Sequence, residues 1–102
     1  MRREATGRSG RVEVDGVGLH YLEYGDGDPV VVVLPGITSP AITWEFVAER
    51  LAADGGRVVV PDIRGRGLSD APETGYALTD YVADAVGLIR ALGLERPVVL
   101  GH

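Results

Sequence analysis

The sequence of 102 residues contains no cysteine and only two histidines. Without cysteine the chain can form neither disulfide bonds nor thiolate-bound zinc or iron–sulfur centres, which excludes the small disulfide-rich secreted proteins. Two histidines placed far apart do not indicate a metal site either. Basic residues are also few, because 10 Lys and Arg stand against 15 Asp and Glu, giving a formal net charge of -5. No stretch concentrates them, so we predict no nucleic-acid partner.

Long hydrophobic runs are missing as well. No segment approaches the roughly 20 apolar residues that a membrane span needs, and the opening MRREATGRSG lacks the apolar core of a signal peptide. We predict that residues 1–10 are a flexible tail and that the protein is cytoplasmic, with no membrane contact. The composition, 45% hydrophobic and 25% charged, is that of a globular domain with a core.

The hydrophobic pattern predicts an α/β fold. Residues 11–29 alternate apolar and polar side chains and contain turn signals at residues 15–16 and 25–29, as expected for two short strands. The runs VVVVLPG, VVVPDIRG and PVVLGH, which begin at Val30, Val58 and Pro97, are typical of strands buried on both faces of a parallel sheet. A helix fits between each pair of runs, so the order is βαβαβ.

Two amphipathic helices are predicted between these strands. In the first, Ser39 can cap the amino terminus and Pro40 suits the first helical position. In the second, Thr79 is the expected cap and residues 93–94 the expected stop. The side chains predicted to face the sheet are Trp44, Val47, Ala48 and Leu51 in the first helix, and Leu78, Val82, Ala85, Ile89 and Leu92 in the second.

Function in an open α/β sheet usually lies at the carboxyl ends of the parallel strands. After the first such strand, Gly36 permits close approach of a ligand, and the backbone N–H groups of Ile37 and Thr38 precede a helix. These donors can hold an oxyanion, and the segment can equally be a plain connecting loop. Both interpretations stay open on the residues alone.

The segment DIRGRGLSD follows the second parallel strand. We expect Asp62 and Arg64 to pair, and Ser69 or Asp70 to bind loop amides. The combination of Asp, Arg and Ser looks catalytic, but a structural loop is the stronger interpretation. The spacing matches neither G-x-G-x-x-G nor G-x-x-x-x-G-K-[ST], so the motif for binding a dinucleotide or a nucleotide phosphate is missing.

At the third strand end, Gly101 and His102 match the first two positions of the nucleophile elbow G-x-S-x-G. With GLHYLEYGDGDPVVVVLPG, Trp44, VVVPDIRGRGLSD and LTDYVADAVGLIRALGL, this ending resembles the N-terminal part of an α/β-hydrolase. The resemblance implies a three-layer α/β/α domain over residues 11–102, with a mostly parallel sheet, incomplete and truncated before the nucleophile. It implies a nucleophile immediately after His102, an oxyanion donor in the N–H of Ile37, and substrate contacts from Gly36 and Thr38.

The sequence departs from the family pattern at Pro35, where the family usually has histidine. This departure narrows the choice among members of the family. The segments LPGITSPAITWEFVAERL and DIRGRGLSD are similar to the N-formylmaleamate deamidases. This similarity implies a Ser-His-Asp triad that hydrolyses an amide bond, releases maleamate and formate in nicotinate degradation, and uses no metal or organic cofactor. The implied partner is a small-molecule substrate.

Several alternatives remain. Aspartate in place of serine at the elbow would fit dehalogenases or epoxide hydrolases, serine would also fit esterases, and a fragment without a nucleophile would be a binding module. We expect structural roles for His20 and His102, packing roles for Trp44 and the tyrosines, and a solvated face at Asp80 and Asp84. The 102 residues alone are expected to be inactive, and marginally stable or oligomeric, with the missing C-terminal part of the same fold as the natural cover of the sheet.

Overall fold

The computed structural model describes residues 7–36, 39–53 and 55–101. Its centre is a five-stranded sheet in the order β1-β2-β4-β3-β5. The strands are β1 (Arg8–Val14), β2 (Val17–Gly25), β3 (Val30–Leu34), β4 (Arg57–Pro61) and β5 (Val98–Gly101). Strands β4, β3 and β5 run parallel to one another, whereas β2 pairs antiparallel with both β1 and β4. The predicted parallel core and its antiparallel hairpin are therefore confirmed.

The first hairpin turns at the predicted place. Asp15 and Gly16 both have positive φ angles, of 47° and 83°, and Val14 pairs with Val17 across them. This is the primed type of turn, whose twist matches that of the flanking strands. The hairpin also corrects the predicted tail, because β1 begins at Arg8, which pairs with Glu23. The last three residues assigned to the tail belong to the sheet.

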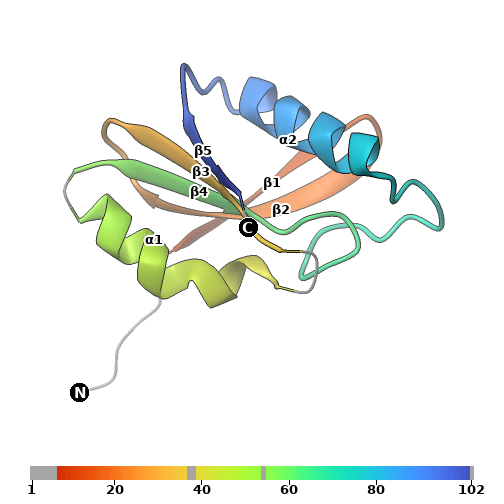
Figure 1. Ribbon diagram of the computed structural model, residues 1–102, viewed down its shortest axis with the longest axis horizontal. Helices are drawn as coiled ribbons and strands as arrows, with labels where there is room; N and C mark the ends of the chain where they lie inside the picture. The colour runs from red at the N-terminus through yellow and green to blue at the C-terminus, as the bar shows by residue number, and fades with distance from the viewer. Residues whose placement is uncertain (1–6, 37–38, 54, 102) are drawn as a thin grey trace.

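The two helices lie on opposite faces of the sheet, α1 (Glu45–Ala52) below it and α2 (Leu78–Ala91) above it in Figure 1. On the α1 face, Leu22, Tyr24, Val33, Ala48, Val58 and Val60 form one buried cluster with Ala41. On the α2 face, Val32, Val59, Leu88 and Leu94 form the other. Because the central strands are buried on both faces, their β-branched runs lack alternation, as expected for a parallel sheet.

The first helix starts differently from the prediction. A short 3-10 helix, η1 (Ala41–Trp44), precedes α1, and Pro40 rather than Ser39 occupies its capping position, without a side-chain hydrogen bond. The side chains that pack on the sheet are Ala41, Trp44, Ala48 and Ala52. Val47 and Leu51, predicted to face the sheet, are exposed. The packed stripe repeats every four residues, through Trp44, Ala48 and Ala52, and is narrower than the predicted stripe.

The start of α2 also corrects the prediction, because Ala77 and not Thr79 stands at the cap. The Asp80 carboxylate, in the first turn of the helix, accepts the backbone N–H of Ala77 at 2.9 Å. The N–H group at the cap is therefore hydrogen-bonded by a side chain of the helix itself. The stop is confirmed, since Gly93 has a φ of 65° and the N–H of Leu94 bonds back to the Ile89 carbonyl. The buried side chains of α2 are Asp84 and Leu88, whereas Leu78 and Val82 are exposed.

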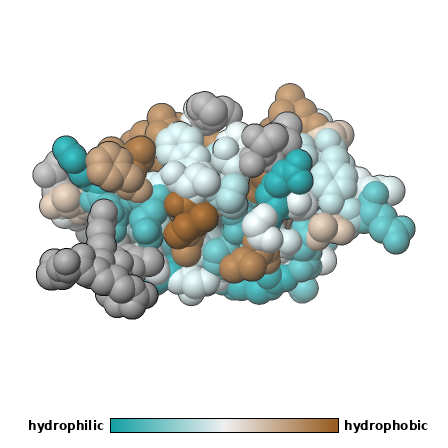
Figure 2. Space-filling view, turned by 90° about the horizontal axis from the view of Figure 1, so that it is seen from below, coloured by the Kyte–Doolittle hydropathy of each residue, from teal (hydrophilic) through white to brown (hydrophobic). Residues whose placement is uncertain are grey.

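The edge of the sheet formed by β5 is apolar. Val98, Val99 and Leu100 of β5 are exposed to 55%, 51% and 41%, as expected if the chain leaves part of its sheet uncovered. From the α1 side, apolar side chains form separate patches between hydrophilic ones (Figure 2). In the described segments, no helix has both the length and the hydropathy needed to cross a bilayer.

Candidate functional site

The carboxyl ends of β3, β4 and β5 meet at one edge of the sheet. Leu34 pairs with Gly101 and Val32 with Val59, so the segments that follow these strands leave the sheet side by side. Adjacent strands lie about 4.8 Å apart. The structure thus brings together the strand ends that lead into two predicted site segments, one containing Gly36 and the other beginning at Gly101. Ile37, Thr38 and His102 lie outside the described residues, and their predicted roles stay predictions.

Asp62 follows β4 directly and is the most connected carboxylate of this edge. One of its oxygens, Oδ1, accepts the backbone N–H of Ala41 at 2.6 Å, and the other, Oδ2, accepts the N–H of Leu68 at 3.1 Å. The residue is only 3% exposed. Through Ala41 it anchors the start of η1, and therefore the C-terminal end of the loop that leads from β3 to the first helix.

Asp62 also pairs with His20 rather than with Arg64, which corrects the expected ion pair. The distance from His20 Nδ1 to Asp62 Oδ2 is 2.7 Å, and both residues are buried. On the other side of the ring, His20 Nε2 lies 2.6 Å from Ser9 Oγ. The histidine is a buried core residue, as predicted in kind, and its ring has partners from two places in the fold, Ser9 in β1 and Asp62 at the end of β4.

Arg64 instead holds Asp84 of α2. Its Nε and Nη2 atoms each donate to one carboxylate oxygen at 2.6 Å, and Nη1 donates to the Gly75 carbonyl at 2.7 Å. This forked geometry is the strongest arrangement of a guanidinium and a carboxylate, and the bond to Asp84 raises the pKa of Arg64. Asp84 is 7% exposed, so the solvated face predicted for it is wrong.

The rest of DIRGRGLSD is structural. The Asp70 carboxylate accepts the backbone N–H of Gly18 at 2.8 Å and bonds to Arg11. The hydrogen bond from the Gly18 N–H lowers the pKa of Asp70, and the bond to Arg11 lowers it further. Ser69 Oγ accepts the N–H of His20 at 2.8 Å and donates to the Asp62 carbonyl at 2.6 Å. Ser69 and Asp70 therefore tie the loop to strand β2. They bind backbone amides, as predicted in kind, but these amides belong to the strand and not to the loop, which corrects the expected partners.

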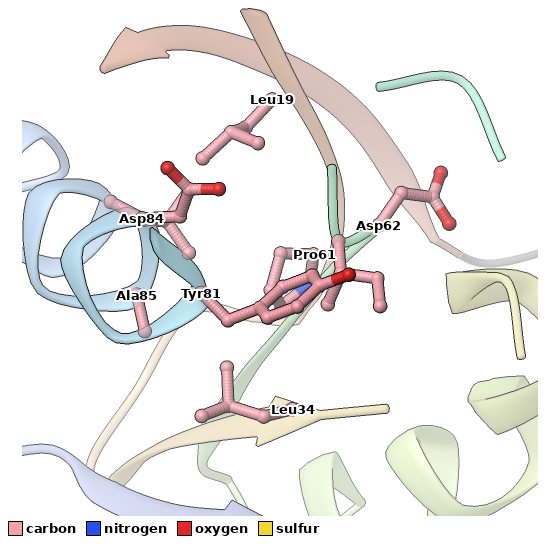
Figure 3. Close-up of a pocket in the computed structure, with 9 residues that line it drawn as sticks. Leu19, Leu34, Pro61, Asp62, Tyr81, Asp84 and Ala85 are labelled. Atoms are coloured by element: carbon pink, nitrogen blue, oxygen red, sulfur yellow. The ribbon is translucent and has the colours of Figure 1, made fainter. Parts of the chain in front are cut away.

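Two hollows flank this edge, one on each face of the sheet. On the α2 side, a cavity of about 20 Å³ lies among Leu34, Pro61 and Tyr81, which is room for about one water (Figure 3). The Asp62 side chain points away from that cavity (Figure 3). Asp62 nevertheless borders both hollows, and the second is an open hollow of about 410 Å³ that it lines with Ser9, His20, Leu22, Pro40, Ile42, Gly67 and Leu68.

The sequence held one signal for this cluster. In β2, His20 stands on the same face as Leu22 and Tyr24, which belong to the core. A titratable side chain at an inward position of an alternating strand needs a buried partner. That rule predicts a partner for His20 but does not identify Asp62, which lies 42 residues further along the chain.

Comparison with known proteins gives consistent matches. Residues 29–102 match the model of a family described as alpha/beta hydrolase fold. The chain is 46% identical over 94 residues to an N-formylmaleamate deformylase of Pseudomonas putida, covering 91% of this chain and 35% of that protein. It is 40% identical over 94 residues to a 2-(acetamidomethylene)succinate hydrolase of Mesorhizobium japonicum, covering 92% of this chain and 33% of that protein.

Among solved structures, an epoxide hydrolase of Vigna radiata superimposes with a TM-score of 0.89 at 35% identity, covering 95% of this chain and 32% of that chain. In each of these three matches the chain spans about a third of the relative's length.

Proposed function

The chain belongs to the alpha/beta hydrolase fold family, and from this premise we propose that the protein hydrolyses an amide C–N bond. The proposed substrate is N-formylmaleamate, which reacts with water to give maleamate and formate. The observation that carries the proposal is the 46% identity to an N-formylmaleamate deformylase over nearly the whole chain. We further propose a cytoplasmic role in nicotinate degradation, on the same likeness.

A second relative supports the reaction class. The succinate hydrolase at 40% identity is named for a compound that, like N-formylmaleamate, carries an acylated nitrogen and a carboxylate. The two relatives differ in the acyl group, formyl in one name and acetyl in the other. Attack on an acyl carbon attached to nitrogen is therefore the chemistry that both share, and the small acyl group is the variable part.

The strand ends suit this chemistry. Hydrolysis of an amide by a nucleophilic side chain passes through a tetrahedral intermediate whose oxyanion needs backbone donors. We propose that one donor is the N–H of Ile37 and that the nucleophile follows His102. The pairing of Leu34 with Gly101 supports this assignment, because it starts both segments from neighbouring strands. Gly36 and Thr38 are proposed to contact the substrate.

Asp62 gives this proposal a rigid support. Its bond to the Ala41 N–H fixes the chain four residues after Ile37, and the carboxylate is itself held by His20. A donor that is held in place before the reaction stabilises the oxyanion without reorganisation during it, and we propose that this anchor at Ala41 serves the N–H of Ile37 in that way. The reaction consumes only water, so the proposal requires no cofactor.

Epoxide hydrolysis is the second candidate, favoured by the TM-score of 0.89 with the Vigna radiata enzyme. The two candidates differ in the nucleophile. An acyl-transfer enzyme of this fold places serine at the elbow, whereas the family resemblance implies aspartate for an epoxide hydrolase.

The test is to determine the residue encoded after His102 and to replace it by alanine in the expressed protein. Serine there, with glycine two residues later, together with loss of amide hydrolysis in the alanine variant, supports the proposal. If the residue is aspartate and the unmodified protein opens an epoxide such as styrene oxide, the protein is an epoxide hydrolase and the proposal is wrong. Replacing Glu13 by glutamine, an exposed position of β1, serves as the matched control and leaves either activity unchanged.

A further inference from the structure

Ser9, His20 and Asp62 form a continuous hydrogen-bonded series in the order of a catalytic triad. Ser9 pairs with Leu22 across β1 and β2, which places its side chain on the same face as that of His20 two residues earlier. Ser9 Oγ lies 2.6 Å from His20 Nε2, and His20 Nδ1 lies 2.7 Å from Asp62 Oδ2. Both distances are within the range of a working nucleophile, base and orienting acid.

The hydrogen bonds of Asp62 determine where the imidazole proton lies. The carboxylate already accepts two backbone N–H groups, from Ala41 and Leu68, and acts only as an acceptor. His20 Nδ1 must therefore carry a hydrogen and donate it to Asp62. In the neutral ring, Nε2 then has a free lone pair directed at Ser9, whose hydroxyl donates to it. This is the tautomer that a general base requires.

The serine of this series is accessible. Ser9 is exposed on the edge strand β1, whereas His20 is 7% exposed. Ser9 opens into the hollow of about 410 Å³, whose other walls include the apolar side chains of Ile42 and Leu68. The base is thus shielded from water and the nucleophile is not, and the adjoining surface suits a small apolar group.

We propose that Ser9 is a second nucleophile of this protein, activated by His20 and oriented through Asp62, and reactive toward activated esters with small apolar acyl groups. It is independent of the elbow nucleophile proposed above. With p-nitrophenyl acetate, Ser9 Oγ forms a bond to the acetyl carbon while its proton moves to His20 Nε2. The ester C–O bond then breaks, and p-nitrophenolate leaves and takes up that proton. The product is an acetyl ester on Ser9.

Two other interpretations of the cluster are weaker. A metal site needs a third ligating side chain, and none joins His20 and Asp62 within the described part of the chain. A purely structural role would explain the bonds of Asp62 to Ala41 and Leu68. It gives no reason for a histidine that presents an acceptor nitrogen to an exposed serine, and it predicts no chemical reactivity.

The test uses the protein as it is encoded, incubated with a fluorophosphonate probe and digested for peptide mapping by mass spectrometry. Ser9 Oγ displaces fluoride from phosphorus, so the peptide that carries Ser9 is expected to gain the phosphonyl mass. Because general-base assistance contributes about 10²–10⁴-fold, His20→Gln should slow this labelling by at least about 100-fold. Ser9→Ala should abolish it, and the matched control Ser39→Ala should not change it.

Denaturation provides a readout that does not depend on how the variants fold. The unmodified protein should lose labelling at Ser9 when unfolded in urea, because the three side chains come from separate segments. An unlabelled Ser9 peptide in protein shown to be folded by circular dichroism overturns the proposal, and so does equal labelling in urea. Peptides downstream of His102 are mapped in the same digest, so a result at the elbow nucleophile is distinguished from a result at Ser9.

Discussion

Removing one partner of the buried Arg64–Asp84 pair should destabilise the protein far more than removing both. The side chains of the pair are 10% and 9% exposed and share two hydrogen bonds of 2.6 Å. Arg64→Met leaves the Asp84 carboxylate buried without its counter-charge, at an expected cost of about 3–5 kcal/mol in the free energy of unfolding. Asp84→Leu leaves Arg64 with only its bond to the Gly75 carbonyl and should cost a similar amount.

The double variant Arg64→Met/Asp84→Leu buries no charge, so its stability should be equal to that of the unmodified protein or greater. Urea unfolding of the four proteins followed by circular dichroism gives the coupling energy. Arg11→Met provides the control, because its pair with Asp70 is about half exposed and exposed ion pairs contribute little to stability. Single variants that each lose less than about 1 kcal/mol, or a double variant that loses the sum of both, would show that the pair is not a coupled buried ion pair.

Two further perturbations address the loops at the strand ends. The N–H of Gly18, and after it Arg11, lower the pKa of Asp70 in the folded protein. The ionised Asp70 therefore stabilises the folded state at pH values above its unfolded pKa of about 4, and this stabilisation is lost as the pH falls through the lower folded pKa. Asp70→Asn should therefore reduce the melting temperature at about pH 7 and progressively less toward about pH 3; a deficit independent of pH would contradict this. Ile37→Pro removes the proposed oxyanion donor and should lower kcat about 10²–10³-fold with little change in KM, whereas Ile37→Ala keeps the N–H. Equal losses in both variants would assign the effect to the side chain.

The architecture was predictable where local chemistry decides it. The turn at Asp15 and Gly16, the three β-branched strands and the stop at Gly93 each follow from a few adjacent residues, and all were confirmed. The packing faces of the helices were less predictable. In α1 the small side chains of Ala48 and Ala52 pack on the sheet, whereas Leu51 is exposed. In α2, Asp84 rather than the apolar Val82 occupies the buried face.

The connections of the site depend on tertiary structure and could not be read from spacing. Asp62 and Arg64 are close in sequence and were expected to pair, yet they bond to elements on opposite faces of the sheet, His20 toward α1 and Asp84 in α2. Two residues that are two positions apart at the end of a strand can point to opposite faces of the sheet once the chain turns. The partner that each side chain meets on its face is determined by the tertiary structure. The same holds for Ser9, which reaches His20 through the pairing of β1 with β2.

Amide hydrolysis is our proposal for the complete protein, and formate is the product that identifies it. The most direct measurement is the time course of formate release when the complete encoded protein is incubated with N-formylmaleamate. We expect one formate for each maleamate formed, and loss of both products when the residue after His102 is replaced by alanine. Absence of formate from folded protein that still opens an epoxide or cleaves a simple ester would contradict the assigned reaction.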